Sequence, residues 1–140
     1  MPVSILSPSG YATTRAVAFA DTDGSALLAS AISPLPVTLG TAPTTPLSGA
    51  ATISTVAGPY QPALGREAIL TLSGSWTGTV RVLRSTDGGT TKLPLTVAGS
   101  PWAQFTGNCC EPIWDETEAA ARLYLDIALT SGSLGYRIAQ

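Results

Sequence analysis

Four carboxylates close together in the sequence are the clearest group with catalytic or metal-binding potential: Glu111, Asp115, Glu116 and Glu118. Oxygen ligands of this kind bind Ca²⁺, and a pair of carboxylates can hydrolyse glycosides as acid and base. Their spacing matches no known calcium loop, and nothing indicates which carboxyl group would have the raised pKa of an acid catalyst. We therefore expect an acidic patch that is solvated or lies at an interface, with no catalytic residue, metal or cofactor.

Other reactive residue types are scarce. The 140-residue chain contains no histidine, which excludes Ser-His-Asp and Cys-His catalysis and any His-ligated metal. Its two cysteines, Cys109 and Cys110, are neighbours. A disulfide between neighbours is strained, so we expect two free thiols in a reducing compartment rather than a redox pair. Seven Lys and Arg against nine Asp and Glu give a net charge of -2, which indicates no nucleic-acid partner.

Aromatic residues are the next candidates for recognition. Trp102 and Trp114 fall in a long irregular connection from Gly99 to Thr117, and such connections are usually functional or packed at an interface. With Trp76 and the four tyrosines they could also form a sugar-stacking platform, or simply pack within the domain. We favour Trp102 and Trp114 as interface residues, with Trp76 as a core anchor.

One turn motif can be named, formed by Ser85, Asp87, Gly88, Gly89 and Thr91. It matches the S-x-D-x-G-x-T core of the Asp-box, which occurs in the repeats of sialidase-like propellers. The Asp carboxylate accepts hydrogen bonds from N–H groups of its own turn, and the glycines supply positive φ. A propeller needs several copies at regular spacing, and this chain has one. We expect a structural hairpin turn.

The elements around these residues follow a period of two, which predicts short antiparallel strands. The predicted strands are 51–56, 66–72, 76–84, 92–97, 120–129 and 134–138. Turns are expected at Ser73–Ser75 and Ser131–Ser133, and at most one helical turn within Glu116–Arg122. Several short strands with turns about every ten residues are typical of an antiparallel sandwich, which makes the expected fold class all-β.

The alternation also predicts which side chains share a face. In the strand 76–84 the expected inward set is Trp76, Val80 and Val82. In the other strands the apolar residues that share one face are Ala68, Leu70 and Leu72, then Leu93, Leu95 and Val97, and finally Leu123, Leu125, Ile127 and Leu129.

Charge divides the chain into two parts. Residues 1–65 contain three charged residues and residues 66–140 contain 13. We expect a Pro-rich extended arm over 1–47 and a β-sandwich domain over 48–140. The arm could add strands to a neighbour's sheet or form the first strands of its own sandwich. Its interface candidates are its larger apolar residues, namely Tyr11, Leu27, Leu28, Leu35, Val37 and Leu39. No secretory signal is visible, and no apolar run approaches the roughly 20 residues of a membrane helix, so we expect no membrane partner.

Three segments resemble small structural proteins of tailed bacteriophages and prophages. They are 73–80 (SGSWTGTV), 84–89 (RSTDGG) and the terminal 130–140 (TSGSLGYRIAQ). The resemblance covers residues 48–140, and the arm loosely. It implies a virion component with an Ig-like or jelly-roll sandwich and no enzymatic role, assembled in the bacterial cytoplasm. We expect a capsid decoration or head-fibre type protein that binds other virion subunits as a homo-oligomer, with a trimer favoured. A tail, neck or adsorption component and a carbohydrate-binding module are the alternatives.

Overall fold

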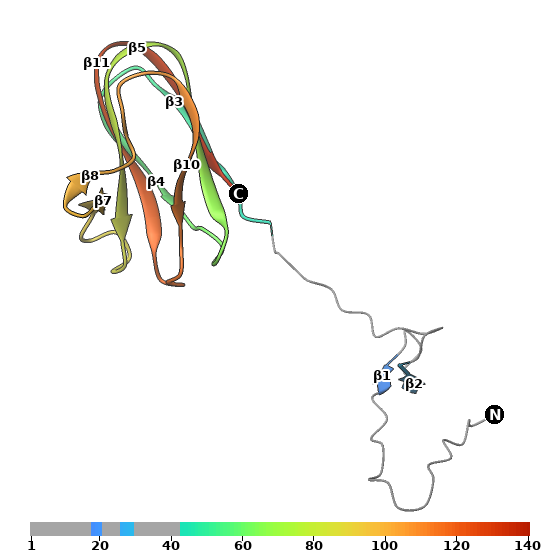
Figure 1. The fold of residues 1–140 in the computed structure, drawn as a ribbon. Coiled ribbons are helices and arrows are strands. Elements are labelled where there is room, and N and C mark those ends of the chain that lie inside the picture. Colours follow the sequence, from blue (N-terminus) through green and yellow to red (C-terminus); the bar gives the residue numbers. More distant parts are fainter. Residues whose placement is uncertain (1–17, 21–25, 30–42) are drawn as a thin grey trace, which may run out of the picture. The chain divides into compact units, whose positions relative to one another are not determined.

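The computed structural model describes residues 18–20, 26–29 and 43–140 (Figure 1). The chain divides into two units, Met1–Gly40 and Thr41–Gln140. In the first unit, β1 (Ala18–Ala20) and β2 (Ala26–Leu28) form an antiparallel pair in which Phe19 lies opposite Leu27. A helix that could span a membrane is absent from the described part of the chain.

The second unit contains nine strands and, in its described residues, no helix. Their bounds are β3 Leu47–Ala51, β4 Thr55–Tyr60, β5 Glu67–Ser85, β6 Leu93–Pro94, β7 Thr96–Val97, β8 Ser100–Pro101, β9 Gln104–Phe105, β10 Cys109–Asp115 and β11 Arg122–Ala139. All their pairings are antiparallel. The predicted all-β antiparallel fold class is confirmed.

Two long strands organise this unit. β5 and β11 pair along almost their whole length, from Ser85 opposite Arg122 to Ile69 opposite Ala139. Near one end of this ribbon, β10 flanks β5 and β3 flanks β11; near the other end, β6 and β9 flank β5 and β4 flanks β11. Figure 1 shows β5 and β11 bending together over the end of the unit at the top of the view. One sheet thus folds over on itself, so that its two halves enclose a common core.

The two predicted turns are wrong, because both segments lie inside continuous strands. Ser73–Ser75 belongs to β5 and Ser131–Ser133 to β11. At the bend Ser75 lies opposite Ser133, and Gly132 lies opposite Trp76. Gly74 and Gly132 have φ of 107° and 92°. A Cβ at Gly132 would lie 2.1 Å from the carbonyl oxygen of Ser75, so only glycine permits this approach. The sequence signal for a chain reversal marks a bend in two paired strands.

The core lies between the two halves and follows the predicted alternation over most of its extent. The largest fully buried apolar side chains are Tyr60, Leu70, Leu72, Val80, Val82, Ile113, Leu123, Leu125, Ile127, Leu134 and Ile138. Trp76 and Leu129 pack against this core and are partly buried. Trp76 is held at the bend because its indole Nε1 donates to Asn108 Oδ1 over 2.8 Å.

Other local predictions need correction. The stretch 99–117 is not one irregular connection, because it contains β8, β9 and the seven-residue strand β10, which includes Trp114. Residues 51–56 do not form one strand, because the chain turns between Ala51 and Thr55. Glu116–Arg122 contains no helix; its backbone connects β10 to β11. Residues 92–97 divide into β6 and β7, and only Leu95 points into the core, while Leu93 and Val97 are 62% and 55% exposed. Pro94 lacks the N–H that a regular strand would use there.

Candidate functional site

A small hairpin presents an exposed tryptophan. β7 and β8 pair through Val97 opposite Ser100, joined by Ala98 and Gly99. These two residues have φ of 50° and 80°, as in a type I′ hairpin turn, which requires positive φ at both central positions. Trp102 follows directly after β8, and its side chain is 46% exposed. An exposed Trp beside an exposed Val97 is an unusual surface for a small domain.

Trp102 is fixed in place despite its exposure. Its backbone N–H donates to the carbonyl oxygen of Leu95 over 2.9 Å, and its indole Nε1 donates to the carbonyl oxygen of Ile113 over 2.9 Å. Ala103, the next residue, is buried and has a φ of 51°. The ring is therefore anchored at its polar edge, and its exposed surface is held ready for contact at little further entropic cost.

Trp102 and Trp114 line one groove of about 530 Å³. Its other lining residues are apolar or acidic, namely Val97, Pro112, Ile113, Glu67, Glu111 and Asp115. The pairing of β10 with β5 places Asp115 opposite Glu67 and Glu111 opposite Leu70. The structure thus brings together the two predicted interface tryptophans and adds Val97 and Glu67, which sequence reasoning did not assign to an interface.

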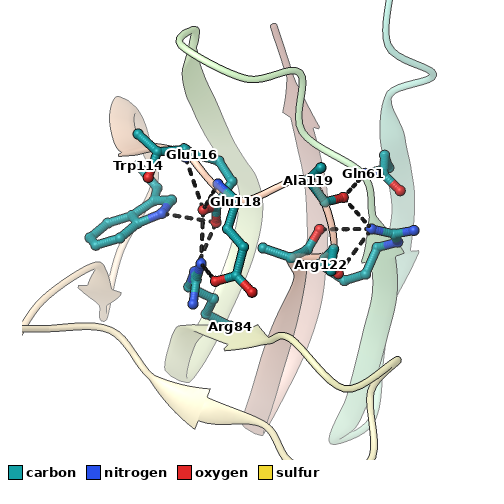
Figure 2. A network of polar contacts seen from close by, with 10 residues as sticks. Gln61, Arg84, Trp114, Glu116, Glu118, Ala119 and Arg122 are labelled. Atoms are coloured by element: carbon teal, nitrogen blue, oxygen red, sulfur yellow. Dashed lines mark hydrogen bonds and ion pairs between the residues drawn. The ribbon is translucent and has the colours of Figure 1, made fainter.

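The predicted acidic cluster separates into two groups. Glu111 and Asp115 are exposed and face the groove, whereas Glu116 is 1% exposed. The Glu116 carboxylate accepts from Arg84 Nε and Nη2, both over 2.8 Å, and Arg84 Nη2 also donates to Glu118 over 2.8 Å. Figure 2 shows Arg84, Trp114 and Glu118 converging on Glu116. The described residues contain no group of His, Cys, Asp and Glu that could hold a metal ion.

Glu116 is a structural anion. Its carboxylate also accepts from the indole Nε1 of Trp114 (3.2 Å) and from the N–H groups of Thr117 (3.0 Å) and Glu118 (2.9 Å). Burial alone would raise the pKa of Glu116, but the hydrogen bonds and charge of Arg84, with the backbone donors, outweigh it and lower the pKa to about 2. The same partners raise the pKa of Arg84.

The connection after Glu116 is held from a second side. Arg122 Nη1 donates to the carbonyl oxygens of Ala119, Ala120 and Ala121 over 3.3, 3.1 and 2.9 Å, and Gln61 Nε2 donates to that of Ala119 over 3.1 Å (Figure 2). These contacts replace the helical hydrogen bonds that the segment was expected to make. The connection that begins with Glu116 is therefore rigid, and it fixes Trp114 beside the groove.

The Asp-box residues form a closed turn after β5. Asp87 Oδ1 accepts from the Thr91 N–H over 2.9 Å and from the Ser85 hydroxyl over 2.7 Å, while Ser85 Oγ accepts from the Gly89 N–H over 2.9 Å. The Thr91 N–H and the Ser85 hydroxyl lower the pKa of Asp87 to about 2. Gly88 and Gly89 have φ of 73° and 94°. All these hydrogen bonds lie within the turn, which leaves the motif a structural role.

The remaining candidates are six apolar residues of the predicted arm and the two cysteines. Tyr11, Leu35, Val37 and Leu39 lie outside the described residues; Leu27 and Leu28 lie in β2, opposite Phe19 and Ala18. Cys109 and Cys110 are free, and burial raises the pKa of the Cys109 thiol. Comparison with known protein families, with curated proteins and with solved structures finds no match.

Sequence reasoning also missed Gln140, which fixes the loop between β4 and β5. Its side-chain Oε1 accepts from the Ala63 N–H over 2.7 Å and from the Tyr60 hydroxyl over 3.2 Å, and its Nε2 donates to the carbonyl oxygens of Ala63 and Arg66. A glutamine supplies both donors and acceptors, so it can satisfy a loop whose backbone groups lack strand partners. In the sequence, Gln140 stands out only as the last residue of the segment 130–140.

Proposed function

We propose that this protein is a non-enzymatic structural component of a bacteriophage virion, of the capsid decoration or head-fibre type. It binds neighbouring virion subunits through its arm and through the groove beside Trp102. The observation that carries the interaction role is the groove itself, where an anchored, half-exposed Trp102 lies next to Val97 and Trp114. Anchored aromatic side chains are the residues that dominate protein interfaces. The phage assignment is supported by the sequence resemblance of residues 48–140.

The structural context of the carboxylates supports a role without catalysis. A glycosidase needs one carboxyl group with a raised pKa, and the pKa of buried Glu116 is instead lowered to about 2. The Ser85 hydroxyl is committed to the turn through Asp87 and Gly89. These groups stabilise the domain, whereas the groove beside Trp102 combines exposed aromatic surface with carboxylates that are unpaired among the described residues.

Particle composition tests the proposal. Virions purified from the phage or lysogen that encodes this chain should contain it in many copies, as measured by quantitative mass spectrometry, and antibodies should label the head. Labelling of the tail instead would favour the tail or neck alternative. Absence from purified particles would overturn the proposal.

Arm deletion tests the binding mode. A chain lacking residues 1–40 retains the complete second unit, so it should keep the circular dichroism and cooperative unfolding of that unit while binding particles more weakly. Light scattering on the full chain measures its oligomeric state, for which a trimer is expected. Unchanged particle binding by the truncated chain would remove the arm from the proposal.

A carbohydrate-binding role is the second candidate, favoured by the exposed Trp102 ring beside carboxylates. A glycan array distinguishes the two functions. Binding of the full chain to a defined glycan, lost in Trp102→Ala and kept in Leu64→Ala, would establish this role. Leu64 is a suitable control because it is 50% exposed and lies outside the groove.

A further inference from the structure

The groove beside Trp102 offers side-chain acceptors but no side-chain cation. Its carboxylates, Glu67, Glu111 and Asp115, are all exposed, and its lining includes neither Lys nor Arg. The ion pairs among the described residues join Arg81 to Asp126 and Arg84 to Glu116 and Glu118. The three groove carboxylates therefore have no ion-pair partner within the described part of the chain, and they place three negative charges around one apolar hollow.

The two tryptophans do not supply free donors to this groove. The indole N–H of Trp102 is bonded to the carbonyl oxygen of Ile113, and that of Trp114 to the Glu116 carboxylate. What they offer a ligand is aromatic surface. At neutral pH the side chains of the groove thus provide hydrogen-bond acceptors and π-faces together, which suits a ligand that is positively charged, rich in donors and partly apolar.

We propose that this groove binds an arginine side chain presented by a neighbouring virion subunit. A guanidinium group has five N–H donors and no acceptor, stacks on aromatic rings and pairs with carboxylates through two hydrogen bonds. The inference rests on the proposed function, because it takes the partner to be a protein of the particle. It adds the chemistry of the contact, with Trp102 as the stacking surface and Glu111 and Asp115 as the candidate partners of the guanidinium.

Arginine fits this groove better than a sugar does. Each sugar hydroxyl both donates and accepts, so a glycan site usually presents side-chain donors as well as acceptors. The carboxylates of this groove accept only, and their mutual repulsion is relieved by a cation and unchanged by a neutral sugar. An arginine is also preferred to a lysine because its planar group can stack on Trp102 while it pairs with a carboxylate.

The first test is a peptide titration of the full-length protein, followed by the indole N–H signals of its three tryptophans in ¹H–¹⁵N spectra. The probe is acetyl-Thr-Val-Arg-Val-Thr-amide, compared with the same peptide carrying citrulline, which has nearly the same shape without the charge. We expect the Arg peptide to shift the Trp102 signal with a Kd on the order of 1 mM, and citrulline to weaken binding about tenfold or more. Raising the salt from about 0.05 M to about 0.5 M should also weaken binding.

Matched variants assign the effect to the groove. The triple variant Glu67→Gln, Glu111→Gln, Asp115→Asn removes the three charges from exposed positions and should abolish the shift, while the exposed Glu118→Gln, outside the groove, should retain it. Equal binding of the Arg and citrulline peptides, or equal binding by the triple variant, would overturn the inference. Binding of oligosaccharides in place of the Arg peptide would overturn it in favour of a glycan site.

Particle incorporation separates this inference from the proposed function. If virions contain the wild-type chain and incorporate the triple variant equally well, the protein is a virion component and the arginine contact is wrong. If virions lack the wild-type chain, the proposed function fails and the peptide titration still decides what the groove binds. Incorporation of the wild type and of Glu118→Gln, with loss of the triple variant, supports both.

Discussion

The acidic residues of one short stretch of chain fall into two sets, a buried one represented by Glu116 and an exposed one formed by Glu111 and Asp115. Glu116 is 1% exposed and accepts hydrogen bonds from Arg84, Trp114 and two backbone N–H groups. Glu111 and Asp115 are exposed, lack an ion-pair partner among the described residues, and face an aromatic groove. The first set stabilises the fold, and the second set is free to meet a partner. Residues of one type a few positions apart can therefore have separate roles, decided by what the fold places opposite them.

The largest expected effect is a loss of stability when the buried carboxylate of Glu116 is neutralised. Glu116→Gln leaves the Arg84 guanidinium without its main counter-ion and should lower the free energy of unfolding by about 3 kcal/mol. Urea unfolding measures the change. Glu111→Gln is the matched control and should stay within about 0.5 kcal/mol of the wild type. Equal losses in the two variants would break the distinction between the sets.

Acid should destabilise the protein through Glu116. Its pKa in the folded chain is about 2, against an ordinary value of 4.5, so the unfolded chain takes up the proton first as the pH falls. The stabilisation is complete above about pH 4.5 and is lost toward about pH 2; by about pH 3 the loss should be about 2 kcal/mol. Urea midpoints across this range test the prediction, and Glu116→Gln should show a flatter profile.

Asp87 contributes to the same pH profile in the same direction, since its pKa is also lowered to about 2. The variant Asp87→Asn therefore serves as a second control. A slope that persists in Glu116→Gln and disappears in Asp87→Asn would assign the acid sensitivity to the turn instead of the buried ion pair.

The two groove tryptophans should also have separate roles: Trp114 mainly stabilises the fold, and Trp102 mainly contacts the partner. Trp114 is half-buried against the core and bonded to Glu116, so Trp114→Ala should cost about 2 kcal/mol of stability. Trp102 is more exposed, and Trp102→Ala should cost about 1 kcal/mol while weakening particle binding more strongly. Thermal unfolding and particle binding of both variants provide the comparison. A larger stability loss in Trp102→Ala would contradict it.

The hairpin that presents Trp102 should accept a stabilising change. Ala98 has a φ of 50°, which costs a residue with a Cβ more than it costs glycine, so Ala98→Gly should raise the free energy of unfolding by about 0.5 kcal/mol. Ala103 also has a positive φ but is buried, so Ala103→Gly should gain less, because it loses packing. Chemical unfolding of both variants tests this difference.

The smallest stability effect is expected for the groove charges. Neutralising Glu67, Glu111 and Asp115 together should change the free energy of unfolding by less than about 0.5 kcal/mol, because all three are exposed and none is paired among the described residues. A large loss would show that these carboxylates are structural.

The sequence predicts the strand class and much of the core because alternation in a half-buried strand is a local property. Leu70, Leu72, Val80, Leu123 and Leu125 are buried as their spacing indicates. The bends at Gly74 and Gly132 could not be foreseen, because a glycine between two serines favours a tight turn and a paired bend equally in one isolated segment. The close backbone approach that requires glycine exists only once β5 and β11 have paired.

The candidate site was predictable in part. Trp102 and Trp114 stand out in the sequence because a long irregular connection is predicted over 99–117, although the structure places Trp114 in strand β10 and Trp102 between β8 and β9. Glu67 comes from a strand more than 30 residues earlier and reaches the groove through its pairing with Asp115. The ion pair of Arg84 with Glu116 is also a contact between distant segments. Residue type and spacing carry no signal for such contacts, which are decided by strand register.

The most direct test of the proposed role is a reconstruction of the virion at a resolution that shows side chains. We expect density for residues 43–140 on the particle, with the groove between Trp102 and Trp114 filled by a neighbouring subunit whose arginine lies against Trp102 and the carboxylate of Glu111 or Asp115. Particles that lack this chain, or that carry it with the groove open to solvent, would contradict this proposal.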